Sequence, residues 1–251
     1  MKRGVYNVSH IVANGCSYTY GEELDVPSKQ SWPALLAQKM NMNLVNIARP
    51  GSGNDGILRR TIEYYYYNLL RYNSTPLFVI ALSFHTRREE YFSYLQDYKH
   101  LIKYENIEDM DDAERYFFLN SEDCVRHKEK LFQWLHLINF FRINDIPYII
   151  GDYMPDIEHF DLTPPPIVKL LMNDERYCGL IPDFTRHLPK KPEFHDGEEA
   201  QEVVANLYHD YINKNYELSI TDSKYLRHDE FFTKKQLKGF KDHHQHHWIG
   251  T

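Results

Sequence analysis

One seven-residue turn of the chain carries a serine in a setting that suits nucleophilic chemistry. Residues 15–21 read GCSYTYG, and Ser17 follows the apolar run of residues 11–13. A hydroxyl held between a strand and a helix can lose its proton to a neighbouring base and attack a carbonyl carbon. Backbone N–H groups at the start of the helix would stabilise the resulting oxyanion. The alternative interpretation is an ordinary turn in which Ser17 caps the helix.

A second turn, at residues 46–55, contains two glycines beside the start of a predicted helix. Gly51 and Gly53 leave backbone N–H groups unobstructed, which suits an oxyanion or a phosphate group. The alternative is a flexible turn in which Ser52 or Asn54 caps the following helix. A Walker A phosphate loop is excluded, because no Gly-Lys-Ser/Thr sequence follows.

Basic side chains follow the third apolar run, at residues 83–89. His85 can donate a hydrogen bond and Arg87 can bind an anion. The alternative interpretation is a solvated charged loop.

A histidine lies in the last loop before the final predicted helix. His195 is well placed there to act as a general base. Glu193, two residues upstream, is a candidate carboxylate for orienting the imidazole. Asp183 and His187 form a second candidate acid–histidine pair in the same loop region.

Short apolar runs alternate with amphipathic segments along the chain. The predicted strands are residues 11–13, 44–47, 77–82 and 147–151, and the predicted helices are residues 32–40, 54–72, 125–144 and a segment that begins at Asp196. Asp196 and Glu199 form a capping-box pattern in that last helix. The alternation predicts an α/β domain with a parallel sheet, whose turns after the strands meet at one edge.

The predicted domain spans residues 1–215. Residues 85–123 are charged and aromatic and interrupt the alternation, so we interpret them as an insertion after strand three. Residues 216–251 form a predicted C-terminal extension. A histidine-dense tract at residues 241–247 could bind Zn²⁺ or Ni²⁺, but ordered ligand spacing is absent, so we predict neither a metal site nor a cofactor.

The composition limits the classes of function. The 251 residues include 36 acidic and 29 Lys and Arg side chains, and the formal charge of −7 argues against a nucleic-acid or anionic-membrane partner. The chain has no apolar run that could span a bilayer, and its start lacks the apolar core of a signal peptide. We therefore expect a soluble cytoplasmic protein. Three widely spaced cysteines predict no disulfide framework.

Taken together, the turns resemble the sequence blocks of the SGNH (GDSL-like) hydrolases. Residues 14–21, NGCSYTYG, resemble the first block, usually Gly-Asp-Ser-Phe/Leu-Thr-x-Gly. Residues 46–51 resemble the second block, and residues 194–200 resemble the last, whose His precedes the C-terminal helix. The resemblance spans roughly residues 9–213, and its GCSYTYG form is similar to variants in bacteriophage and marine bacterial genomes.

The resemblance implies a flavodoxin-like three-layer α/β/α fold and ester hydrolysis without a metal. Ser17 would be the nucleophile, His195 the base, and the N–H groups of Ser17 and Gly51 the oxyanion donors. Asn54 and Arg87 are the candidate substrate-binding residues.

The chain departs from the family pattern at three positions. Cys16 replaces the Asp before the nucleophile, and His85 stands where the third block has an oxyanion-donating Asn. Pro192 stands where the last block has its Asp, so either Glu193 substitutes or a Ser–His dyad acts alone.

We therefore expect a serine esterase that acts on a small ester or an acetylated glycan. Two alternatives stay open. The departures favour a catalytically weak or inactive protein that keeps the fold as a binding or virion-associated module, which would place it in a virion or in host cytoplasm. The turn at Gly51 and Gly53, with Arg49 and Arg87, favours a phosphate- or nucleotide-binding protein. The oligomeric state has no readable signature.

Overall fold

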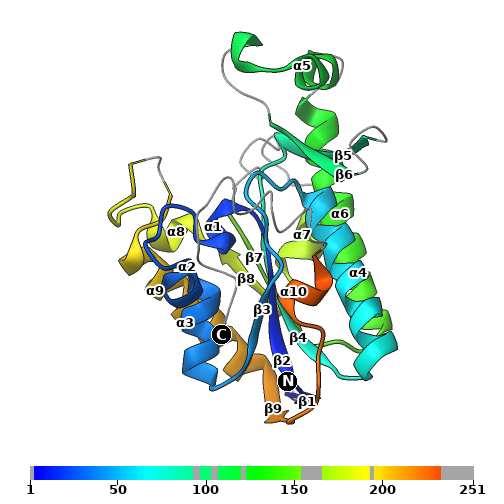
Figure 1. Cartoon of the computed structure of the whole chain (residues 1–251), viewed down its shortest axis with the longest axis vertical. Coiled ribbons are helices and arrows are strands. Elements are labelled where there is room, and N and C mark those ends of the chain that lie inside the picture. Colours follow the sequence, from blue (N-terminus) through cyan, green and yellow to red (C-terminus); the bar gives the residue numbers. More distant parts are fainter. Residues whose placement is uncertain are drawn as a thin grey trace.

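Five parallel strands form the central sheet, in the order β3-β2-β4-β7-β8 (Figure 1). They are β2 (His10–Asn14), β3 (Leu44–Asn46), β4 (Pro76–Leu82), β7 (Tyr148–Asp152) and β8 (Tyr177–Leu180). The computed structural model describes residues 3–92, 97–102, 107–119, 123–153, 166–192 and 195–232. Because the strand order is that of flavodoxin-like folds, the predicted α/β class is confirmed.

Helices cover both faces of the sheet (Figure 1). One face carries α3 (Trp32–Met40) and α9 (Glu198–Asn215), and the other carries α4 (Asn54–Tyr72) and α6 (Asp123–Ile143). Each face has its own apolar core, one containing Trp32 and the other Trp134. All residues of β2, β4 and β7 are buried, as expected for strands covered on both sides. The three-layer arrangement is therefore confirmed.

Five shorter helices complete the domain. They are α1 (Ser17–Tyr20), α2 (Pro27–Gln30), α7 (Pro166–Met172), α8 (Pro182–Thr185) and α10 (His228–Phe231). Two of the elements, α7 and β8, were not predicted; they lie between the predicted fourth strand and the predicted last helix.

The predicted start of the last helix is wrong. The helix α9 begins at Glu198 with Gly197 as its N-cap, and no side chain caps it. Asp196 does not take part in a capping box, because its buried carboxylate pairs with Lys190 instead.

The insertion after strand three folds as a small subdomain. An antiparallel hairpin of β5 (Arg87–Phe92) and β6 (Asp97–Ile102) is followed by a 3₁₀ turn, η1 (Ile107–Asp109), and by α5 (Asp112–Leu119). The hairpin lies over the carboxyl edge of the sheet, and α5 projects beyond it (Figure 1). The insertion therefore lies next to the edge where the predicted site residues meet.

The segment after residue 215 packs with the domain. The strand β9 (Tyr216–Ile220) pairs in parallel with β1 (Gly4–Val8), and Leu226 and Phe232 join the apolar core on the α4 face. The predicted extension is therefore not separate over residues 216–232. The histidine-dense tract lies outside the described residues. Within the described part of the chain, no helix is long and apolar enough to cross a membrane.

Candidate active site

The Ser17 turn is compact and leaves the serine hydroxyl unused. Ser17 is the first residue of α1, directly after the sheet strand β2, and is 2% exposed. Its Oγ has no hydrogen-bond partner among the residues that the structure describes. Gly15 permits the tight turn, because a Cβ there would lie 2.1 Å from Thr19 Oγ1 and 3.0 Å from the Ala81 carbonyl oxygen. The turn therefore presents a buried, unengaged hydroxyl.

Two asparagine side chains hold this turn in place. Asn14 Nδ2 donates to the Ile57 carbonyl at 2.8 Å and to Thr61 Oγ1 at 2.9 Å, which ties the end of β2 to α4. Asn46 Nδ2 donates to the Thr19 carbonyl at 3.0 Å, which ties the end of β3 to α1. Buried amides that are fully engaged in this way rigidify their surroundings.

His195 contacts the turn that begins at Ser17. Its Nδ1 lies 2.8 Å from Glu23 Oε2, and its Nε2 lies 3.4 Å from Glu22 Oε2. The Glu22 N–H in turn donates to the Ser17 carbonyl oxygen at 3.0 Å. The structure therefore brings His195 against Glu22 and Glu23, which follow Ser17 in the same turn, although residue 195 is 172 positions from residue 23.

The carboxylate on His195 Nδ1 is one that the sequence analysis did not consider. Glu193, the predicted acid, lies outside the described residues. Glu23 adopts a left-handed conformation with φ 66°, which a residue with a side chain adopts only at a cost of about 1–2 kcal/mol. Strained residues of this kind concentrate at functional sites. The positive φ places a carboxylate against His195.

Aromatic rings form one wall of the cluster. The Tyr18 ring lies 5.0 Å from the His195 ring and stacks on the Tyr153 ring at 4.7 Å between centroids. Burial raises the pKa of Tyr18 to about 12, with further contributions from Cys16 and Asp196. Tyr18 therefore stays neutral at physiological pH and adds an apolar surface beside the imidazole.

The Gly51 turn is held by a buried ionic cluster, which we call the Glu89 cluster (Arg59, Arg60, Glu89 and His100). Arg60 Nη2 donates to Ser52 Oγ at 2.5 Å, and Arg60 Nη1 lies 2.7 Å from Glu89 Oε1. His100 Nδ1 lies 2.7 Å from the Pro50 carbonyl oxygen. Because Gly51 has φ +74°, this turn requires a glycine. The insertion therefore fixes the turn predicted to stabilise an oxyanion.

Asn54 braces the backbone at the end of β4. Its Nδ2 donates to the Ser83 carbonyl at 2.9 Å, and its Oδ1 accepts from the Ser83 N–H at 2.8 Å. The amide predicted to bind substrate therefore holds the loop that carries His85 and Arg87.

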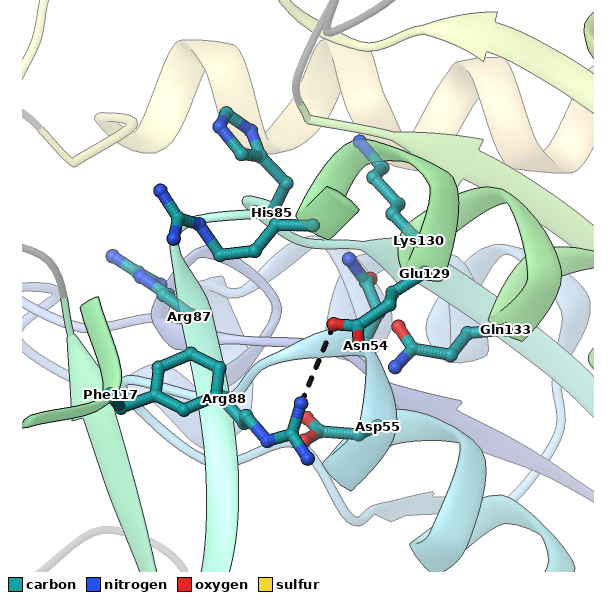
Figure 2. A pocket seen from close by; sticks show the side chains of 10 residues that line it. Asn54, Asp55, His85, Arg87, Arg88, Phe117, Glu129, Lys130 and Gln133 are labelled. Carbon is teal, nitrogen blue, oxygen red and sulfur yellow. Dashed lines mark hydrogen bonds and ion pairs between the residues drawn. The ribbon is translucent and has the colours of Figure 1, made fainter. Parts of the chain in front are cut away.

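His85 and Arg87 face the space between this loop and α6. The His85 ring stacks on the His127 ring, with 3.7 Å between centroids. The Arg87 guanidinium lies 4.5 Å from the centroid of the Phe84 ring. Both residues line a cleft against α6 (Figure 2).

The second predicted acid–histidine pair, Asp183 and His187, lies in α8 and just after it. Asp183 is in the first turn of that helix. Within the described ranges, no group of three or more His, Cys, Asp or Glu side chains is arranged to hold a metal ion.

Comparison with known proteins identifies the fold. No family model and no curated protein sequence matches the chain. The esterase EstA from Pseudoalteromonas sp. is similar in structure, with a TM-score of 0.51 and 14% identity over 82% of this chain and 97% of that chain. TesA has a TM-score of 0.50 and 13% identity, over 82% and 99% of the two chains.

A third similar structure is a carbohydrate esterase family 2 enzyme with a carbohydrate-binding domain, from Corynascus thermopiles (Myceliophthora fergusii). It has a TM-score of 0.52 and 12% identity, over 82% of this chain and 66% of that chain. These structures confirm the fold that the resemblance to the SGNH hydrolases implies.

Proposed function

We propose that the chain is a serine acyl hydrolase with Ser17 as nucleophile, His195 as general base and Glu23 as the carboxylate that orients the base. The observation that carries the proposal is the 2.8 Å contact between His195 Nδ1 and Glu23 Oε2, in the turn that begins at Ser17. A carboxylate on Nδ1 fixes the tautomer of the imidazole and leaves Nε2 to accept a proton. Glu23 takes the place of Glu193, the acid predicted from the sequence.

The reaction follows from these three groups. As Ser17 Oγ attacks the ester carbonyl carbon, its proton passes to His195 Nε2, and the alcohol then leaves with that proton. A water molecule next loses a proton to Nε2 and attacks the acyl group, which releases the acid and restores the serine. Nε2 lies 3.4 Å from Glu22 Oε2 before substrate binds, and hydrogen bonds of free enzymes commonly realign in the substrate complex.

The oxyanion donors in this proposal are the backbone N–H groups of Ser17 and Gly51. The N–H of Ser17 belongs to the first turn of α1, where backbone donors have no partner within the helix. Gly51 is held by the Glu89 cluster. His85, which stands where the family has an oxyanion-donating Asn, stacks on His127, and we assign it to the cleft beside α6. Loss of one oxyanion donor costs about 10²–10³ in rate.

The substrate in this proposal is a small ester or an acetylated glycan. The similar structures include an esterase and a carbohydrate esterase, and the exposed Tyr66 and Tyr67 on α4 offer rings on which a sugar could stack. No metal or cofactor takes part in the proposed mechanism.

Labelling with a fluorophosphonate probe tests the nucleophile. The wild-type protein should acquire one covalent adduct, which peptide mass spectrometry places on Ser17, and it should hydrolyse p-nitrophenyl acetate. Ser17→Ala should lose the adduct and lower kcat by about 10⁴-fold or more. Ser219→Ala, in the exposed part of β9, is the matched control and should behave like the wild type.

The same experiment tests the alternative of a binding module with this fold. If the wild-type protein takes no label and turns over no ester, and Ser17→Ala is indistinguishable from it, the hydrolase proposal is wrong. Equal labelling of the wild type and Ser17→Ala would place the reactive group elsewhere.

A further inference from the structure

The cleft between α6 and the loop after β4 concentrates positive charge in an acidic protein. Its charged lining residues are Arg87, Arg88, Arg126, Lys130, Asp55 and Glu129. Four cations thus face two carboxylates, whereas the whole chain carries a formal charge of −7. Figure 2 shows Arg88 of the hairpin directed at Glu129 of α6 across this cleft. A local field of this sign attracts anions.

Lys130 and Arg88 each contact carboxylates beside the cleft. Lys130 Nζ lies 3.0 Å from both oxygens of Asp152, and both side chains are buried. Arg88 Nε lies 2.6 Å from Glu90, and its Nη1 lies 3.4 Å from Glu129 (Figure 2). These contacts neutralise the Lys130 and Arg88 side of the cleft.

Arg87 differs from Lys130 and Arg88, because one of its buried nitrogens, Nη1, makes no hydrogen bond within the described residues. The guanidinium rests on the Phe84 ring at 4.5 Å, which fixes its plane. A buried guanidinium N–H without an acceptor is unfavourable, and a bidentate oxyanion is the acceptor that matches its geometry.

Arg126 adds a second guanidinium to the lining of the cleft. It is 4% exposed and lies 5.2 Å from the centroid of the Phe118 ring. Asp55, also in the lining, accepts from the Gly56 and Glu89 N–H groups at 2.8 and 2.9 Å. Burial raises the pKa of Asp55 to about 6, so its negative charge is lost only in mildly acidic solution.

The cleft adjoins the proposed catalytic cluster through aromatic side chains. Phe84, on which Arg87 rests, lies 6.4 Å from the Tyr18 ring, and Tyr18 lies 5.0 Å from the His195 ring. The charge of Arg87 also lowers the pKa of Tyr18, against the larger effect of burial. Two aromatic rings, those of Phe84 and Tyr18, therefore connect Arg87 with the imidazole.

We infer that this cleft binds an oxyanion group, a carboxylate or a phosphate, carried by the substrate of the proposed hydrolase. That the anion belongs to a substrate depends on the proposed function. The anion-binding site itself is inferred from the residues of the cleft alone. The preferred ester then carries a negative charge at a short distance from its scissile carbonyl group. Arg87 is the specificity-determining residue, and Arg126 and His85 complete the lining.

Direct binding measurements test the site without reliance on catalysis. Isothermal titration calorimetry at low ionic strength uses succinate and inorganic phosphate as separate probes, with wild-type protein and with Ser17→Ala. At least one probe should bind both proteins, and added salt should weaken it. Arg87→Gln should weaken binding by about 10- to 100-fold, and Arg87→Lys should weaken it less. Arg186→Gln, at an exposed position after α8, is the control and should bind like the wild type.

The two probes distinguish the sources of the oxyanion. Binding of succinate alone assigns a carboxylate, and binding of phosphate alone assigns a phosphate group. If neither probe binds the wild type, or if Arg87→Gln binds as well as Arg186→Gln, the inference is wrong. Binding by a protein that hydrolyses no ester would overturn the proposed function while it leaves the anion site standing.

Kinetics with a matched pair of esters gives a second readout. The wild type should prefer the monoanion p-nitrophenyl succinate over neutral p-nitrophenyl butyrate in kcat/KM. Arg87→Gln should lower kcat/KM for the anionic ester about 10- to 100-fold more than that for the neutral ester. An equal loss for both esters would contradict a role in recognising charge.

Discussion

Replacing Glu89 by glutamine removes the counter-charge of a buried guanidinium. The side chains of Glu89 and Arg60 are 2% and 1% exposed, and their charged atoms lie 2.7 Å apart. Glu89 also lies 2.7 Å from Arg59 and 3.0 Å from His100. Breaking a buried pair by removing one partner costs about 3–5 kcal/mol. We expect Glu89→Gln to lower the free energy of unfolding by that amount and Tm by about 6–20 °C.

The loss should depend on pH in a defined direction. Burial alone would raise the pKa of Glu89, but Arg60, His100 and Arg59 lower it well below its ordinary value of 4.5. A carboxylate whose folded pKa is depressed stabilises the protein above its unfolded pKa, and that contribution is lost as pH falls through the folded pKa. The difference between the wild type and Glu89→Gln should be full at pH 7 and smaller at pH 3.

Urea denaturation followed by circular dichroism measures the free energy of unfolding at pH 7 and at pH 3. Glu63→Gln is the matched control, since Glu63 pairs with Arg59 at 2.6 Å but is 37% exposed, and exposed pairs contribute about 0–1 kcal/mol. A loss below about 1 kcal/mol for Glu89→Gln at pH 7, or a difference that grows on acidification, would refute the electrostatic account of this cluster.

Three other changes have expected outcomes. Glu23→Gln should lower kcat for p-nitrophenyl acetate by about 10- to 100-fold, because a neutral amide stabilises the imidazolium of His195 less than a carboxylate does. Lys130→Met should lower the free energy of unfolding by about 3–5 kcal/mol in urea titrations, because Asp152 loses the partner of a buried pair. Burial lowers the pKa of His10 to about 3 from its ordinary 6.5, so the unfolding free energy should fall as pH drops from 6.5 towards 3.

Each of these expectations has a control. Glu217→Gln, on exposed β9, should leave kcat unchanged, and an unchanged kcat in Glu23→Gln would remove that residue from the mechanism. Lys224→Met, at an exposed position, should change stability by less than about 0.5 kcal/mol. A His10→Asn variant should lose part of the pH dependence between 6.5 and 3, and an identical dependence would assign the acid sensitivity to other groups.

The sequence predicted the parts of the fold whose signal is local. The strand β4 is a continuous apolar run bounded by turn residues, and α3 and α4 have the predicted ends. The strand β8 was missed because it has only four residues, YCGL, at the sheet edge, and one of them is a glycine. The hairpin strand β5, which reads RREEYF, fits no apolar template, since buried ion pairs rather than apolar contacts hold it.

In the candidate site, too, the residues with a local sequence pattern could be predicted and the others could not. Ser17 and His195 were predicted because each lies in a recognisable local pattern. Glu23 was not predicted, because it is 172 positions from His195 and no sequence pattern links the two residues. A positive φ at a residue other than glycine leaves no local signature in the sequence, so only the three-dimensional arrangement reveals the contact.

The pairing of β1 with β9 has a consequence for how the protein is synthesised. The partner of Gly4–Val8 is Tyr216–Ile220. The first strand therefore has no partner strand until almost all of the described chain has been translated. The five-stranded sheet is complete in sequence by Leu180, well before this closure. Chains that end before residue 216 should therefore leave β1 without its partner strand and accessible to protease.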